Sequence, residues 1–134
     1  MKRNSAKVLT TLTCSMVLAA LAPAAQAGRG SSYSRVMTAI NTGGVESIIG
    51  ELEQAERLIC PGCVAPVMKL LDDDRYAVRE VAAWWLACRP AQKKQVTEMS
   101  LQRLVTGNSV EVRNAADALG TFRHPQAIAP LATA

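Results

Sequence analysis

Apolar residues recur every three or four positions through most of residues 36–120, and short polar or glycine-containing segments interrupt them. This spacing puts the apolar side chains on one face of a helix and predicts amphipathic helices around a common core. Turns are expected at residues 41–44, 72–74 and 107–108. The chain shows no alternation of apolar and polar residues of the kind that indicates a strand, so the fold class is predicted to be all-α. The expected helices are residues 36–40, 45–59, 64–71, 78–88, 92–106 and 109–120.

Several boundaries and faces are predicted from local signals. The first two helices, within residues 35–60, are expected to cap the rest of the fold. The tetrapeptide Cys-Pro-Gly-Cys at residues 60–63 is expected to break a helix, the acidic turn 72–74 to cap the next one, and Gly107 and Gly120 to end helices. The glutamates of the second helix are expected on its solvent side, namely Glu46, Glu51, Glu53 and Glu56.

One stretch of the chain repeats. Residues 70–85 are echoed by residues 104–119, and each residue of the second stretch lies 34 positions after its counterpart. Self-similarity at this period is typical of stacked helical units that cannot bury their apolar faces alone. The repeat therefore predicts a short α-solenoid, an architecture that provides a binding surface without naming what binds.

The repeated residues carry a family resemblance. Val-Arg-Asn-Ala-Ala-Asp-Ala-Leu-Gly at residues 112–120 and Val-Arg-Glu-Val-Ala-Ala at residues 78–83 resemble HEAT repeats of the bacterial phycobilisome-lyase HEAT-like class. The resemblance implies antiparallel helix pairs over residues 61–134: two pairs, then residues 125–134 as the first helix of a truncated third. Repeats of this kind serve as scaffolds, chaperone-like factors and enzyme parts, so the function has to be argued from a site.

The resemblance also implies a role for two arginines. In HEAT-like stacks the arginine at the position of Arg79 and Arg113 commonly pairs with acidic or amide groups in the turn of its own or the next repeat. The matching groups here are Asp73, Asp74 and Asn108. A structural ladder is therefore expected, and the alternative is a row of ligand-binding arginines on the inner surface.

The N-terminus has the pattern of an export signal. Three basic residues precede an uncharged apolar run at residues 8–22, and the small residues Ala25 and Ala27 come before Gly28. This pattern predicts a cleaved signal peptide at residues 1–27, with an uncleaved membrane anchor as the alternative. The exported product would be periplasmic or secreted, would keep no stable membrane span, and would begin with a flexible tether at residues 28–34.

Removing this leader changes the charge balance. Residues 28–134 contain 12 basic and 11 acidic residues, so the basic character of the whole chain comes mainly from the leader. No basic stripe with interleaved aromatic residues is present, which argues against a nucleic-acid partner. The remaining 107 residues suffice for one small domain.

Three cysteines follow the leader, at positions 60, 63 and 88. Export into an oxidising compartment favours a structural disulfide, and Cys60, Cys63 and Cys88 allow three single bridges, each of which leaves one thiol over. Antiparallel packing would bring Cys60 or Cys63 near Cys88. The alternative is a redox pair of Cys60 and Cys63, because a cysteine at a helix N-terminus has more thiolate character.

The residue types and motifs of the chain give little support for enzymatic activity or metal binding. The chain has a single histidine, and it shows no Ser/His/Asp order, no glycine-rich phosphate loop and no set of four zinc ligands. A non-catalytic protein without a cofactor or a metal is therefore predicted.

Adjacent tryptophans suggest an interaction surface. Trp84 and Trp85 point about 100 degrees apart on a helix, so they cannot both face the same neighbour. Trp84 is expected at or beside the concave face as an anchor for another protein, whereas packing of both rings in the core is the alternative. The sequence thus predicts a protein-interaction scaffold, with a thiol-disulfide redox protein or a fragment of a longer repeat protein as alternatives.

Overall fold

The structure of the protein is a computed structural model that describes residues 30–133. This part of the chain contains seven α-helices, two 3₁₀ turns and no strand, so the predicted all-α class is confirmed. The predicted signal peptide, residues 1–27, lies outside the described residues, as do residues 28 and 29 of the predicted tether. The elements are α1 (Tyr33–Thr42), α2 (Val45–Gln54), α3 (Pro61–Lys69), η1 (Leu70–Asp72), α4 (Tyr76–Ala87), α5 (Pro90–Thr106), α6 (Ser109–Phe122), η2 (Pro125–Ala127) and α7 (Ile128–Thr133).

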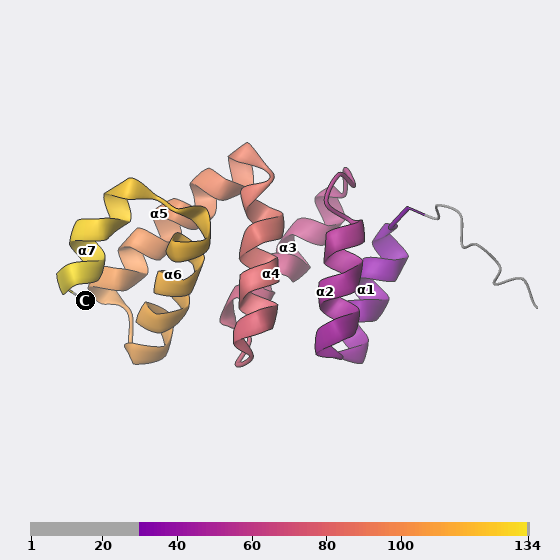
Figure 1. Ribbon diagram of the computed structural model, residues 1–134, viewed down its shortest axis with the longest axis horizontal. Coiled ribbons are helices and arrows are strands. Elements are labelled where there is room, and N and C mark those ends of the chain that lie inside the picture. The colour runs from indigo at the N-terminus through magenta and orange to yellow at the C-terminus, as the bar shows by residue number, and fades with distance from the viewer. Residues whose placement is uncertain (1–29, 134) are drawn as a thin grey trace, which may run out of the picture.

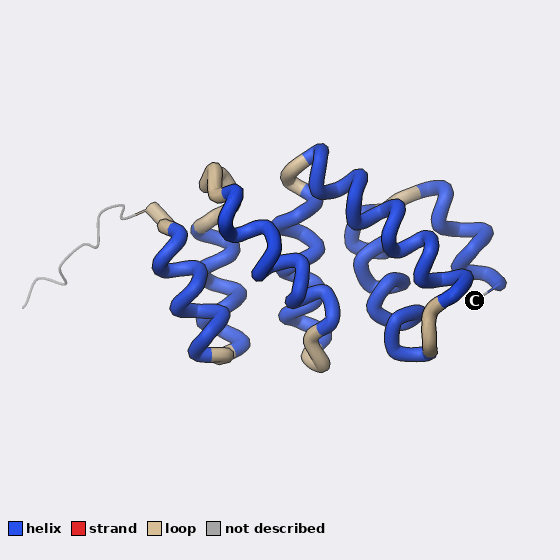
Figure 2. Tube along the Cα trace, turned by 180° about the vertical axis from the view of Figure 1, so that it is seen from behind, coloured by secondary structure: helices blue, strands red, loops and turns tan. Residues whose placement is uncertain are grey.

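The helices lie side by side in two layers. α2, α4 and α6 form the layer nearer the viewer in Figure 1, and α4 packs between the other two. α3 and α5 lie behind them and come to the front in Figure 2. The turns from α1 to α2, from α3 to α4 and from α5 to α6 all lie at the lower end of Figure 1. The front layer therefore joins helices that are far apart in the sequence.

Local signals account for several helix ends. Pro61 and Pro90 begin α3 and α5, where the missing N–H of proline costs no helical hydrogen bond. The Asn108 side chain accepts hydrogen bonds from N–H groups in the first turn of α6, and the Glu111 carboxylate accepts one from the Asn108 N–H. This reciprocal capping box stabilises the start of α6. Gly43 ends α1 with a φ of 70°, a left-handed conformation that favours glycine.

Two helices begin inside segments that were predicted to be non-helical. The tetrapeptide 60–63, predicted to break a helix, begins α3, because the φ of Pro61 suits the first helical position. α1 begins at Tyr33, inside the predicted tether, because the Ser32 hydroxyl accepts a hydrogen bond from the Arg35 N–H.

Two helix ends also differ. α2 ends at Gln54 rather than at residue 59, because Arg89 donates hydrogen bonds to three backbone carbonyl groups in the segment that follows. Ile59 is therefore 92% exposed instead of lying on the apolar face. α6 continues through Gly120 to Phe122, since Phe122 is buried in the core. Burial and long-range hydrogen bonds thus move these two helix ends away from the positions that the local pattern indicates.

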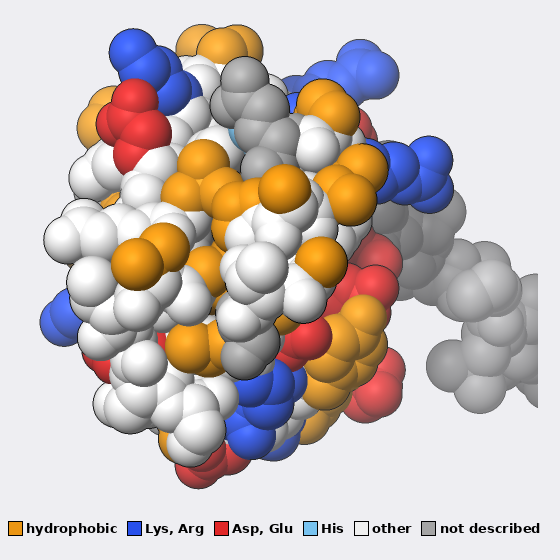
Figure 3. Space-filling model, turned by 90° about the vertical axis from the view of Figure 1, so that its left-hand side faces the viewer, with side chains coloured by type: hydrophobic (Ala, Val, Ile, Leu, Met, Phe, Trp, Pro, Cys, Tyr) orange, Lys and Arg blue, Asp and Glu red, His pale blue; other side chains and the backbone are white. Residues whose placement is uncertain are grey.

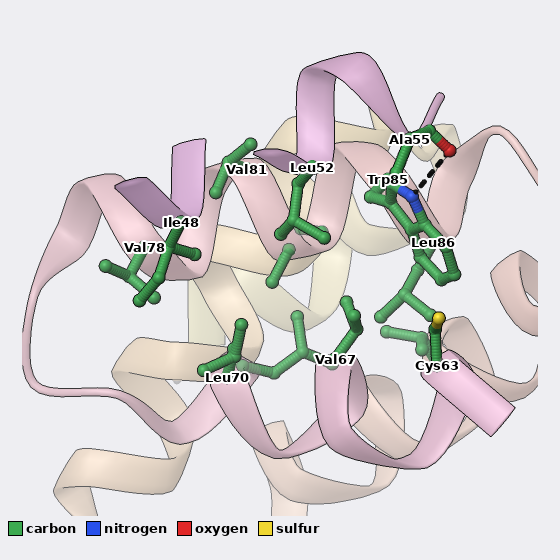
Figure 4. Close-up of a cluster of buried hydrophobic side chains, with 14 of the residues drawn as sticks. Ile48, Leu52, Ala55, Cys63, Val67, Leu70, Val78, Val81, Trp85 and Leu86 are labelled. Atoms are coloured by element: carbon green, nitrogen blue, oxygen red, sulfur yellow. Dashed lines mark hydrogen bonds between the residues drawn. The ribbon is translucent and has the colours of Figure 1, made fainter. Parts of the chain in front are cut away.

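The main hydrophobic core lies between α1, α2, α3 and α4 and extends to side chains of α5 and α6. Trp85 is fully buried in it, and its Nε1 donates to the carbonyl oxygen of Ala55 at 3.1 Å (Figure 4). The guanidinium of Arg89 lies over the Trp85 ring, 3.3 Å from its centroid. The buried polar atom of this indole is therefore satisfied, as buried tryptophans require.

Glu51 corrects one prediction about the solvent face of α2. Its side chain is buried, although the amphipathic pattern places it in water. Arg35 donates to its carboxylate from Nε at 3.1 Å, and the Ser31 hydroxyl also donates to it. The burial is tolerated because both oxygens of the carboxylate are hydrogen-bonded to partners that precede α2 in the sequence.

A smaller hydrophobic cluster lies at the C-terminal end, where Leu104, Ala115, Leu119 and Ala127 are buried together. The predicted helix 125–134 is a 3₁₀ turn followed by the short helix α7, which packs on α5. Figure 3 shows this end of the molecule, with hydrophobic side chains gathered at its surface. Exposed apolar residues of this region include Val105, Ile128 and Leu131.

Candidate functional site

A shallow groove of about 320 Å³ opens on the front layer at Trp84. α2, α4 and α6 all contribute to it, so it exists only when the three helices pack together. Its lining residues are Ile49, Glu53, Ala77, Glu80, Val81, Trp84 and Thr121.

The groove combines an apolar floor with acidic groups. Ile49 and Trp84 pack against the main core on one side and line the groove on the other. Glu53 and Glu80 are exposed, and no basic residue lines the groove. Within residues 30–133, neither carboxylate forms an ion pair. The site therefore offers an aromatic surface beside two unneutralised negative charges.

The two tryptophans have different environments. Trp85 is fully buried, whereas Trp84 is half-buried and reaches the groove. The rings of Trp85 and Phe122 lie close to cationic side chains, from Arg89 and Lys93, but the described residues place no cation over Trp84. The exposed part of the Trp84 ring is thus open to a ligand.

Arg79 serves a structural role in α4. Its side chain is buried, and its Nε and Nη2 donate to Asp117 Oδ2 at 3.0 and 2.7 Å. Its Nη1 donates to the carbonyl oxygens of Asp73 and Asp74 at 2.8 and 2.9 Å. The predicted turn residues are therefore contacted through their backbones and not through their carboxylates. Asp117 is a partner that the repeat pattern did not indicate, since it comes from the neighbouring helix α6.

Arg113 differs from Arg79 despite its equivalent place in the repeat. It is exposed, and its Nε and Nη2 donate to Asn114 Oδ1 at 3.2 and 3.1 Å. It does not contact Asn108, whose side chain caps α6. The two arginines therefore do not form a uniform ladder, because their hydrogen-bond partners and their burial differ.

Two carboxylates of the acidic turn before α4 are paired with arginine side chains. Asp73 accepts hydrogen bonds from the Arg75 backbone N–H at 2.9 Å and from its Nε and Nη2, both at 2.8 Å. Asp72 pairs with Arg103 on α5 at 2.8 Å. Asp73 thus binds the side chain of Arg75 instead of capping α4, whose N-cap Arg75 makes no side-chain capping bond. Within residues 30–133, no cluster of three His, Cys, Asp or Glu residues could hold a metal ion.

Asp73 makes the stability dependent on pH. Hydrogen bonding from Arg75 lowers the pKa of Asp73 below its ordinary value of 3.8, although partial burial opposes the shift. Because the folded pKa is the lower one, Asp73 stabilises the fold above pH 3.8, and this stabilisation is lost as the pH falls through the folded pKa. Asp73→Asn should therefore destabilise the protein more at pH 7 than at pH 2, as measured by urea unfolding at both pH values.

Asp74→Asn is the matched control, since the Asp74 carboxylate accepts no hydrogen bond in the described part of the chain. It should change the stability less than Asp73→Asn at pH 7. An equal loss for Asp73→Asn at both pH values would contradict the assignment.

Two of the three cysteines, Cys60 and Cys88, line a second cavity near the end of α4. Cys60 and Cys63 form a disulfide with a Cα–Cα distance of 5.3 Å, and Cys88 is an exposed free thiol. Of the three bridges that the sequence leaves open, the structure contains this one. Cys60 and Cys88 both line a cavity of about 470 Å³.

Comparisons of the chain with models of protein families, with curated proteins and with solved structures give no match. None of the helices in residues 30–133 has the length and hydrophobicity that crossing a membrane requires. The groove at Trp84 and the cysteine cavity are therefore the features from which a function can be argued.

Proposed function

We propose that this protein is an exported, non-catalytic scaffold of HEAT-like repeats that binds a segment of another protein in the groove at Trp84. The repeat of 34 residues and the two layers of antiparallel helices support the repeat architecture. The basic and apolar N-terminus with its small-residue cleavage pattern supports export. The observation that carries the binding role is the groove itself, where an aromatic ring meets two carboxylates that form no ion pair within residues 30–133.

The chemistry of the groove defines the partner segment. Glu53 and Glu80 attract positive charge, and an exposed tryptophan ring binds cations through its face. Ile49 and Val81 provide the apolar surface on which an aliphatic side chain is desolvated. The partner is therefore a peptide segment that carries an aliphatic residue flanked by arginine or lysine.

Peptide titration tests this proposal. A fluorescein-labelled peptide with a central Leu between Arg residues should bind more tightly than the same peptide with Glu in place of Arg, and more tightly than one with Ser in place of Leu. Trp84→Ala should weaken binding of the first peptide by about 30-fold, the loss expected for an aromatic anchor. Glu53→Gln and Glu80→Gln should each weaken it by about two- to fivefold, and less at high salt.

Arg113→Ala is the control for this titration, because Arg113 is exposed and does not line the groove. It should leave the affinity unchanged. Circular dichroism of each variant separates lost binding from lost folding. Equal affinity for all peptides, or an unchanged affinity in folded Trp84→Ala, would exclude the groove as the binding site.

A further inference from the structure

We infer that Cys88 and the Cys60–Cys63 disulfide form a thiol–disulfide exchange site, in which the Cys88 thiol can displace Cys63 from Cys60. The inference is independent of the groove at Trp84. It rests on one cavity that both Cys60 and Cys88 line, and on the disulfide that joins Cys60 to Cys63. The cavity lies between the segment after α2, the start of α3 and the end of α4.

Accessibility selects the sulfur that is attacked. Cys60 lines the cavity and is 9% exposed, whereas Cys63 has no exposed surface and does not line it. Cys88 is exposed and lines the same cavity. An attacking thiolate in the cavity therefore reaches Cys60 and not Cys63.

The leaving group is also well placed. Cys63 lies in the first turn of α3, where the positive end of the helix dipole stabilises a thiolate. A more stable thiolate is a better leaving group in disulfide exchange. The N-terminus of α3 therefore stabilises the thiolate of Cys63 once its bond to Cys60 breaks.

Arg89 holds the two sides of the cavity together. Its guanidinium donates to the carbonyl oxygens of Ala55, Glu56 and Leu58 on one side and to that of Trp85 on α4 at 2.6 Å. Arg89 also lines the cavity, next to Cys88 in the sequence. Its positive charge interacts electrostatically with Cys88, and its hydrogen bonds keep the segment before Cys60 beside the end of α4.

The exchange conserves electrons and protons, so it needs no oxidant. The sulfur of Cys88, after losing its proton, forms a bond to the sulfur of Cys60. The Cys60–Cys63 bond breaks, its electron pair goes to Cys63, and Cys63 takes up a proton. One disulfide and one thiol exist before and after the step, so the protein has two disulfide isomers. A cysteine thiol of a peptide could enter the same cavity and attack Cys60 in the same way.

Single cysteine variants of the full chain test this inference, in a Cys14→Ser background that removes the leader cysteine. Under air in mildly alkaline buffer, Cys63→Ser should form an intramolecular Cys60–Cys88 bridge, mapped by alkylation and mass spectrometry. Cys60→Ser is the matched control, and it should form a Cys63–Cys88 bridge at least about tenfold more slowly because Cys63 is buried. In guanidinium chloride the two rates should become similar.

The parent chain provides a measurement that does not depend on a folded variant. After anaerobic incubation and alkylation, a part of the molecules should carry the label on Cys63 and the disulfide between Cys60 and Cys88. Equal native rates for the two variants, or a label confined to Cys88 in the parent, would overturn the inference.

Discussion

Trp85→Ala should lower the free energy of unfolding by about 3–5 kcal/mol, the usual cost of removing a large buried aromatic side chain. Trp85 has no exposed surface and packs between helices of both layers, so the substitution leaves a cavity that the core cannot fill. It also removes the hydrogen bond to Ala55 and the ring on which Arg89 lies. Urea unfolding followed by circular dichroism measures the change.

Trp84→Ala is the matched control for this prediction, because it removes the same side chain from the next position of α4. Trp84 is only half-buried, so less apolar area leaves water when the protein folds. We expect a smaller loss of stability than for Trp85→Ala, and a folded protein that lacks the groove's aromatic surface. Equal losses would show that Trp84 serves the core, and they would remove the basis for an anchor at the groove.

Arg79→Ala should lower the free energy of unfolding by about 2–4 kcal/mol. The substitution removes the partner of Asp117 and leaves two carbonyl oxygens of the preceding turn without their donor. Breaking a buried pair by removing one partner is strongly destabilising. The expected loss of stability is near the lower end for such pairs because the Asp117 side chain is still 23% exposed to solvent. Urea unfolding at neutral pH measures it.

Arg113→Ala tests the same residue type at the equivalent position of the repeat, 34 residues later. Arg113 is exposed, and within residues 30–133 its side chain donates hydrogen bonds to its neighbour Asn114 alone, so we expect a change within about 0.5 kcal/mol. A loss similar to that of Arg79→Ala would mean that both arginines stabilise the fold in the same way, contrary to their contacts.

These two predictions also bear on binding. The groove is lined by side chains from α2, α4 and α6, so any substitution that loosens their packing will also weaken peptide binding. Arg79 joins α4 to α6, and Trp85 joins α4 to the segment after α2. Binding measurements on Trp85 and Arg79 variants therefore need stability data beside them, whereas Trp84→Ala and the glutamate variants report on the groove itself.

The sequence by itself determined the all-α class and the positions of most turns. Both depend on interactions between residues three or four apart and on caps such as Asn108 with Glu111, which the spacing of residue types reveals. It also indicated that Trp84 and Trp85 point in different directions, since that follows from helix geometry alone. The local pattern failed at Gly120 and residue 59, where core packing of Phe122 and the hydrogen bonds of Arg89 moved the helix ends.

Only the tertiary structure decided which distant groups meet. The pairing of Arg79 with Asp117 joins residues 38 positions apart, and the burial of Glu51 depends on Arg35 in the preceding helix. The placing of Glu53 beside Trp84 likewise depends on how helices pack. The Cys60–Cys63 bridge, by contrast, joins residues three positions apart at the start of α3. The physical reason is that hydrophobic periodicity defines which face of a helix is buried, while the partner that a charged side chain finds on another helix is set by the relative positions of whole helices.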